Sequence, residues 1–231
     1  MIWTEESAKL LWRAYQKGAA VKTLADLITP ALGPGAQLCD AGCGVGALSL
    51  ELARRGFRVT ALDISDIALG QLPQHDLITV RHEDAGKHVP KTAYDAMIFS
   101  FFGDMEQCLR MAARCCAGDV FYISRDYDMH RFSVGKHPVR YSGYHQAMAH
   151  LDELFIPYQA QAFELDMGQP FASLEEARRF FALYSRDNDS SLITDEFLRS
   201  RLVEKKDGGY PLYLPHMRRC GMVHFQVKDI P

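Results

Sequence analysis

Residues 36–64 read AQLCDAGCGVGALSLELARRGFRVTALDI, and this stretch decides the fold. A short apolar run ends at Asp40, a turn with three glycines follows, a leucine-rich segment comes next, and a second apolar run ends at Asp63. Glycines let the backbone turn sharply and let a ligand approach the main chain without a Cβ in the way. The stretch therefore predicts a strand, a glycine turn, a helix and a second strand.

The same alternation of short apolar runs and helical patterns continues to about residue 125. We expect further strands at residues 77–80, 94–99 and 120–123, with helices at residues 67–72 and 105–115. Strands that alternate with helices form right-handed crossovers, which build a parallel sheet covered by helices on both faces. The nearly continuous apolar strands agree, because central parallel strands are buried on both sides.

The flanking regions are more helical. Residues 1–35 predict an N-terminal helical segment that Thr4 caps and that Gly33-Pro34-Gly35 ends. Beyond residue 125 we expect a helix at residues 141–155 and a strand at residues 158–165.

The segment before the last expected strand, at residues 222–227, is too long for a plain loop. A capping box at Ser173 to Glu176 opens one helix there, and a second helix starts near Thr194 and ends near Lys205. We therefore predict a helical cap insertion at about residues 170–209, between the last two of seven strands.

Three acidic residues stand at the ends of three successive strands. Asp40 precedes the glycine turn, where a carboxylate would repel a phosphate and attract an ammonium group. Asp63 can accept both hydroxyls of a ribose, and a side-chain carboxylate in the stretch His82-Glu83-Asp84-Ala85 can accept from an adenine amino group. Each acid on its own can also be a solvated strand-end residue. The glycine turn alone is ambiguous too, because it satisfies the relaxed dinucleotide fingerprint.

The run LCDAGCGVGALSLELARRGFRVTALDIS, followed by HEDA and YDAMIFSFFGD, resembles the class I S-adenosylmethionine-dependent methyltransferases, in particular their small-molecule branch. The resemblance covers residues 36 to about 125 well. It implies a doubly wound α/β fold with a mostly parallel seven-stranded sheet, whose terminal strand is antiparallel. On this basis residues 36–231 are expected to form the methyltransferase domain.

The resemblance also implies a cofactor site for S-adenosylmethionine, which leaves as S-adenosylhomocysteine. Asp40, Gly42 and Gly44 would hold the methionine part, and Asp63 would bind the ribose with Ile64 against the adenine. The remaining positions are Asp84 at the adenine amino group with Ala85 beside it, and Ser100 under the sulfonium.

The methyl acceptor is not identified by any motif. We expect a small, partly apolar molecule, with Phe101, Phe102, Arg125 and Tyr144 as candidate substrate-binding residues. Packing against neighbouring helices is the competing interpretation of the two phenylalanines. Two aromatic sets have the same ambiguity between core packing and a ligand site: Trp3, Trp12 and Tyr15, and Phe180, Phe181 and Tyr184.

The sequence identifies no catalytic base, and methyl transfer from a sulfonium can proceed without one. Asp126, His130 and His145 are the candidates, and for each an ordinary surface or capping role is the alternative. The alternative functions are a macromolecule methyltransferase, a catalytically silent S-adenosylmethionine-binding module and an NAD(P)-dependent oxidoreductase.

Composition argues against several other classes of protein. The 231 residues have a formal net charge of −3, and their basic residues are scattered, whereas nucleic-acid-binding proteins usually carry a basic face. No apolar run approaches the roughly 20 residues that span a bilayer, and the first residues lack the pattern of a signal peptide. The six cysteines and nine histidines have no spacing typical of a metal site. We therefore expect a cytoplasmic protein without a metal, a membrane or a nucleic-acid partner.

Overall fold

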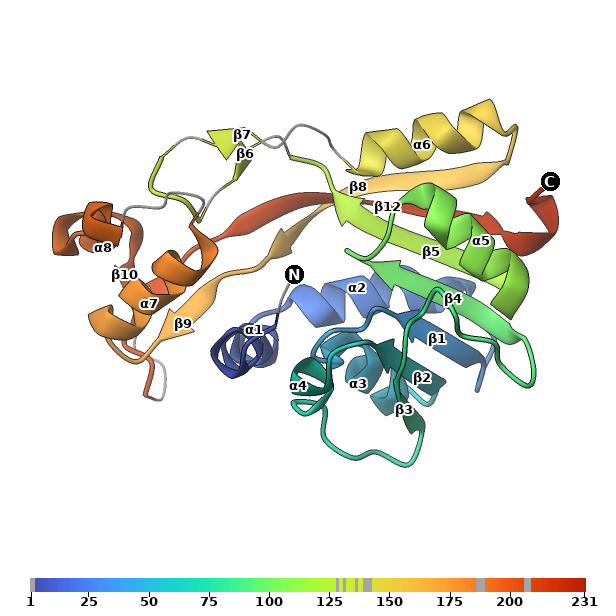
Figure 1. Cartoon of the computed structure of the whole chain (residues 1–231), viewed down its shortest axis with the longest axis horizontal. Helices are drawn as coiled ribbons and strands as arrows, with labels where there is room; N and C mark the ends of the chain where they lie inside the picture. Colours follow the sequence, from blue (N-terminus) through green and yellow to red (C-terminus); the bar gives the residue numbers. More distant parts are fainter. Residues whose placement is uncertain are drawn as a thin grey trace.

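In a computed structural model, the chain is described at residues 3–127, 129–130, 132–135, 137–138, 143–185, 190–205 and 209–231. Its centre is a seven-stranded sheet in the order β3-β2-β1-β4-β5-β12-β8 (Figure 1). The strands are β1 (Gln37–Ala41), β2 (Arg58–Asp63), β3 (Ile78–His82), β4 (Tyr94–Ser100), β5 (Cys116–Arg125), β8 (Tyr158–Asp166) and β12 (Met217–Gln226).

The predicted fold class is confirmed by the strand pairing. β1 pairs in parallel with β2 and β4, β2 with β3, and β4 with β5. β12 runs antiparallel to both of its neighbours, so that Val223 lies opposite Tyr122 of β5 and Ala160 of β8. The last strand of the chain therefore lies between β5 and β8, and β8 forms the edge of the sheet.

Helices cover both faces of this sheet. On one face α1 (Glu5–Lys17), α2 (Ala20–Ile28) and α3 (Ala47–Arg54) share an apolar core with the sheet. On the other face α5 (Met105–Cys115) and α6 (Gly143–Glu153) pack over β5 and β12 (Figure 1). The short α4 (Asp66–Leu69) follows β2. The first two helices are therefore part of the main core, and the predicted domain boundary at residue 36 stays a prediction. None of the helices in the described ranges is long and apolar enough to cross a membrane.

The segment between β8 and β12 forms the lobe at the left of Figure 1. Its helical elements are α7 (Leu174–Tyr184), the 3₁₀ turn η2 (Ser190–Leu192) and α8 (Asp195–Arg201). It also holds a small antiparallel sheet of β9 (Gln169–Phe171), β11 (Leu212–Leu214) and β10 (Val203–Glu204). The helices were predicted and the small sheet was not, because strands of two or three residues are too short to show an alternating pattern.

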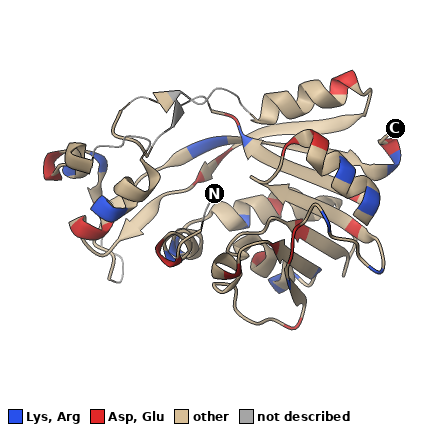
Figure 2. Ribbon diagram, viewed as in Figure 1, with Lys and Arg blue, Asp and Glu red and all other residues tan. Residues whose placement is uncertain are grey.

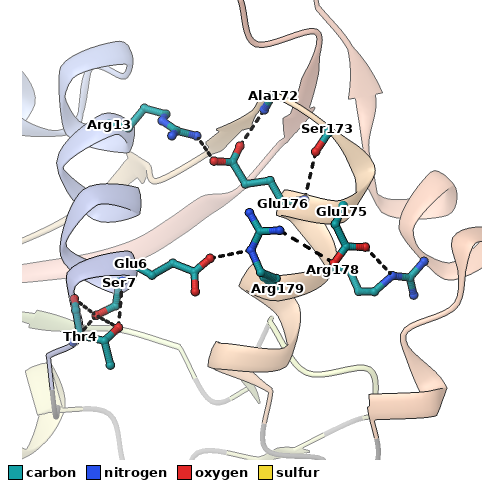
Figure 3. A network of polar contacts seen from close by, with 10 residues as sticks. All are labelled: Thr4, Glu6, Ser7, Arg13, Ala172, Ser173, Glu175, Glu176, Arg178 and Arg179. Atoms are coloured by element: carbon teal, nitrogen blue, oxygen red, sulfur yellow. Dashed lines mark hydrogen bonds and ion pairs between the residues drawn. The ribbon is translucent and has the colours of Figure 1, made fainter.

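Helix α1 connects this lobe to the main sheet (Figure 3). Arg13 pairs with Glu176 of α7 at 2.8 Å, and the other oxygen of that carboxylate accepts from the Ala172 N–H at 2.7 Å. Glu6 at the start of α1 pairs with Arg179 at 2.8 Å. Because the Arg13–Glu176 pair is only partly exposed, it is screened less than a surface pair.

A separate two-stranded hairpin, β6 (Met129–His130) with β7 (His137–Pro138), lies between β5 and α6 in the chain.

The glycine turn between β1 and α3 depends on left-handed backbone angles. Gly42 has a φ of +68°, a value that side chains rarely adopt. A Cβ on Gly42 would lie 2.2 Å from the ring of Phe102 and 2.8 Å from its Cβ. The turn is therefore restricted to glycine at position 42 by both conformation and space.

We predict that Gly42→Ala destabilises the protein more than Gly35→Ala, its matched control. Gly35 has a φ of +70°, but a Cβ added there would meet nothing within 4 Å, so its substitution reports backbone strain alone, about 1 kcal/mol. Gly42→Ala adds a steric collision with Phe102, and overpacking of this kind lowers stability by about 1–3 kcal/mol more. Chemical denaturation of both variants measures the difference, and equal losses would contradict the restriction.

Candidate active site

A cavity of about 590 Å³ opens at the carboxyl ends of β1, β2 and β4. Doubly wound sheets bind their ligands at this edge, and the volume is in the range of small-molecule sites. The cavity extends from the glycine turn to α1, α7 and the start of β12. Its two halves differ in chemistry.

The inner half is built around Asp63, the last residue of β2. One carboxylate oxygen accepts from the Gly44 N–H at 2.8 Å and the other from the Ser65 N–H at 2.9 Å. A carboxylate can accept about four hydrogen bonds, so both oxygens keep acceptor capacity toward the cavity. The lining of this half consists of Trp3, Gly42, Cys43, Gly44, Val45, Asp63, Ile64, Ser65, Asp66, Ser100, Phe101 and Phe102.

Asp40 lies behind the glycine turn, next to a small cavity of about 40 Å³ that Ser100 also lines. It is 1% exposed, and one of its oxygens accepts from the Ser49 hydroxyl at 2.6 Å. Burial raises the pKa of Asp40 to about 6, although the hydrogen bond from Ser49 opposes the shift. The carboxyl is therefore a titratable group close to neutral pH.

The outer half is mostly aromatic and apolar. The rings of Phe132, Phe180 and Tyr184 contact one another at centroid distances of 4.7–5.7 Å. The lining of this half consists of Leu11, Ala14, Tyr15, Phe132, Met167, Gln169, Phe180, Tyr184 and Arg218. Among the described residues that line the whole cavity, Arg218 is the one lysine or arginine. This half therefore presents an aromatic, apolar lining with a single cation.

The structure brings together about half of the predicted site residues. The cavity is lined by seven of them, namely Gly42, Gly44, Asp63, Ile64, Ser100, Phe101 and Phe102. Asp84 and Ala85 do not line it. Asp84 accepts from the Gly86 N–H at 2.9 Å, and Ala85 is buried in the core beneath α5. Their adenine-binding roles stay predictions.

The predicted acceptor and base residues mostly lie elsewhere. Asp126 is buried and pairs with His145 and Arg219, each at 2.8 Å, and Tyr144 packs over Gly221 on the α6 face of the sheet. Neighbouring side chains of a strand point to opposite faces. Arg219 therefore faces Asp126, whereas Arg218 reaches the cavity.

The other two predicted residues add nothing to the cavity lining. Arg125 lies opposite Cys220 in the sheet and is absent from the lining. His130 has its backbone in β6, and its side chain falls outside the described part of the chain.

Sequence reasoning missed Arg218, Gln169 and Phe132. Arg218 has the same parity as Cys220 and Met222, which face the α1–α3 core, so period-two alternation could have placed it on that face. The predicted strand began only at Met222, five residues after the start of β12, and this hid the signal. Gln169 and Phe132 have no local pattern that could have identified them.

Comparison with known proteins gives a family and a fold. A family profile described as "Methyltransferase domain" matches residues 12–182. The chain is similar to magnesium-protoporphyrin O-methyltransferase of Synechocystis sp., at 51% identity over 41 residues, which are 18% of each chain. It is also similar to an S-adenosyl-L-methionine-dependent Diels-Alderase of Neonectria sp., at 53% identity over 36 residues, 16% of this chain and 15% of the relative. The chain thus matches less than a fifth of the length of these curated relatives.

Solved structures share the fold at low sequence identity. A protein described as a candidate methyltransferase from an antibiotic biosynthesis pathway of Anabaena variabilis has a TM-score of 0.57 and 16% identity, over 91% of this chain and 98% of that one. The YcgJ protein of Bacillus subtilis has a TM-score of 0.54 and 13% identity, over 89% and 97%. These likenesses show the fold, and the profile match over most of the chain shows the family. The chain belongs to the methyltransferase domain family.

Proposed function

We propose that this chain binds S-adenosylmethionine and transfers its methyl group to a small-molecule acceptor inside the 590 Å³ cavity. The observation that carries the proposal is that one cavity joins a glycine turn and the Asp63 carboxylate to an aromatic, largely apolar half. The family uses S-adenosylmethionine, and the lining residues fit that molecule. The similarity to magnesium-protoporphyrin O-methyltransferase supports methyl transfer to a small molecule.

The residues of the inner half suit the parts of the cofactor. Asp63 has free acceptor capacity for the two ribose hydroxyls, and Ile64, which is 70% exposed beside it, offers an apolar contact for the adenine. Gly42 and Gly44 line the cavity and would present their backbone to the methionine part, and the buried Asp40 would supply negative charge near its ammonium group. A pyrophosphate would be repelled at the same place, which disfavours a nicotinamide cofactor.

When bound, S-adenosylmethionine supplies a sulfonium methyl group; the acceptor forms a bond to its carbon while the S–C bond breaks and the electron pair goes to sulfur. The protein's part is to align the two molecules and to exclude water. No histidine lines the cavity in the described part of the chain, and Asp126 is held by Arg219 and His145 outside it. We therefore assign no general base, and the acceptor's proton, where it has one, leaves to solvent.

The position of the insertion supports a small acceptor over a macromolecule. Helices α1 and α7 both line the outer half, and the ion pairs between them hold the insertion against α1 (Figure 3). Figure 2 shows acidic and basic residues interspersed along α5, α7 and α8. A cavity bounded by two helices suits an acceptor that can enter it whole.

We predict that Asp63→Asn weakens binding of S-adenosylhomocysteine by about 10- to 100-fold, because hydrogen bonds to a charged acceptor are worth about 1.5–3 kcal/mol. Asp66→Asn is the matched control, because Asp66 also lines the cavity and loses the same charge. Calorimetric titration compares the two variants, and thermal unfolding checks that both are folded. Equal effects of the two substitutions, or tight binding of NADH without binding of S-adenosylhomocysteine, would overturn the proposal.

A second prediction concerns the pH dependence of cofactor binding. Asp40 attracts an ammonium group only when ionised, and its pKa in the folded protein is about 6. The ionised fraction rises from about one in eleven at pH 5 to ten in eleven at pH 7. The dissociation constant of S-adenosylhomocysteine should therefore fall about tenfold over this range.

Two variants separate Asp40 from other titrating groups. Asp40→Asn, which keeps an acceptor for Ser49, should bind weakly and without this pH dependence. Ser49→Ala removes a hydrogen bond that lowers the pKa of Asp40, so the midpoint of the pH dependence should move upward. A pH profile that is unchanged in both variants would exclude Asp40 from cofactor binding.

A further inference from the structure

The outer half of the cavity contains a cation for which the described chain supplies no counter-charge. Arg218 takes part in none of the ion pairs formed by described residues, whereas its neighbour Arg219 pairs with Asp126 at 2.8 Å. Burial raises the pKa of Tyr15 to about 12 and also raises that of Tyr184. Both phenols therefore stay neutral at pH 7 and do not balance the guanidinium.

The guanidinium of Arg218 is held in a fixed orientation. Its Nε donates to Nε2 of the buried His216 at 2.8 Å, and its central carbon lies 5.1 Å from the ring centroid of Phe132. The terminal nitrogens have no hydrogen-bond acceptor among the described residues. A guanidinium that is fixed through Nε and stacked on a ring presents its remaining donors as a fork, a geometry that matches a carboxylate.

A second polar group in this half also has an unused hydrogen-bond acceptor. Gln169 is 3% exposed and lines the cavity, and its side-chain nitrogen donates to the Pro170 carbonyl at 3.3 Å. Its side-chain carbonyl has no donor among the described residues. Buried polar groups are normally paired, so this oxygen suits a hydrogen-bond donor on a bound molecule.

We propose that the methyl acceptor is a planar, largely apolar acid, whose anionic oxygen is bound by Arg218 and whose ring lies against Phe132, Phe180 and Tyr184. Gln169 would accept a hydrogen bond from a hydroxyl or amine on the same molecule. The inference rests on the proposed function, because it assigns the outer half to the acceptor.

The experiment uses planar acids as probes, each paired with its neutral carboxamide: benzoate, 2-naphthoate and anthracene-2-carboxylate. Their binding to the full chain is measured by calorimetry with and without saturating S-adenosylhomocysteine. We expect at least one acid to bind at least tenfold more tightly than its amide. Arg218→Gln should abolish this preference, and Arg218→Lys should keep part of it, because lysine retains the charge without the fork.

Arg219→Gln is the matched control, since it removes the same charge from the neighbouring residue on the opposite face of β12. It should keep the preference for acids, and thermal unfolding should show all variants folded. If no acid binds better than its amide, the inference is overturned even though S-adenosylhomocysteine binds. If Arg218→Gln weakens S-adenosylhomocysteine tenfold and leaves the acids unaffected, Arg218 serves the cofactor and the inference is wrong. Failure of wild-type protein to bind S-adenosylhomocysteine overturns the proposed function instead.

Discussion

The attachment of the glycine turn to the end of β2 is the constraint on which the rest of the site depends. The Leu62 carbonyl accepts from the N–H groups of Gly42 and Cys43, at 2.8 and 3.0 Å, and Asp63 accepts from Gly44. These bonds fix the turn in a left-handed conformation that only glycine adopts without strain. The same bonds hold the Asp63 carboxylate at the cavity, so one arrangement forms the turn and orients the acid.

The antiparallel strand β12 gives the cavity its second half. Because β12 enters the sheet between β5 and β8, its first residues continue from the insertion directly to the cavity. Alternation along the strand then divides two adjacent arginines: Arg219 faces Asp126, and Arg218 faces the cavity. A charge that would otherwise be neutralised within the protein is thereby available to a ligand.

Much of the architecture could be predicted because its signals are local. Helix α5 has the predicted bounds of residues 105–115, and the glycine turn and Asp63 were identified from residues 36–64 and their resemblance to a known family. Prediction was less complete where contacts join distant segments. The residues that follow β5 in sequence were expected near the reaction centre, because ligands bind beyond the carboxyl ends of parallel strands. The packing of α6 against β12 instead places Asp126, Tyr144 and His145 on the other face of the sheet.

The sequence by itself determined the alternating strands and helices of the parallel half, the glycine turn and the acid at its side, because each depends on residues close in the chain and on periodic burial. Only the tertiary structure decided which residues line the outer half of the cavity. Tyr15, Phe180 and Arg218 come from α1, α7 and β12, and they meet because an insertion folds back over the sheet and is held to α1 by the Arg13–Glu176 pair. Such a site forms from long-range packing, and no local pattern in the chain encodes it.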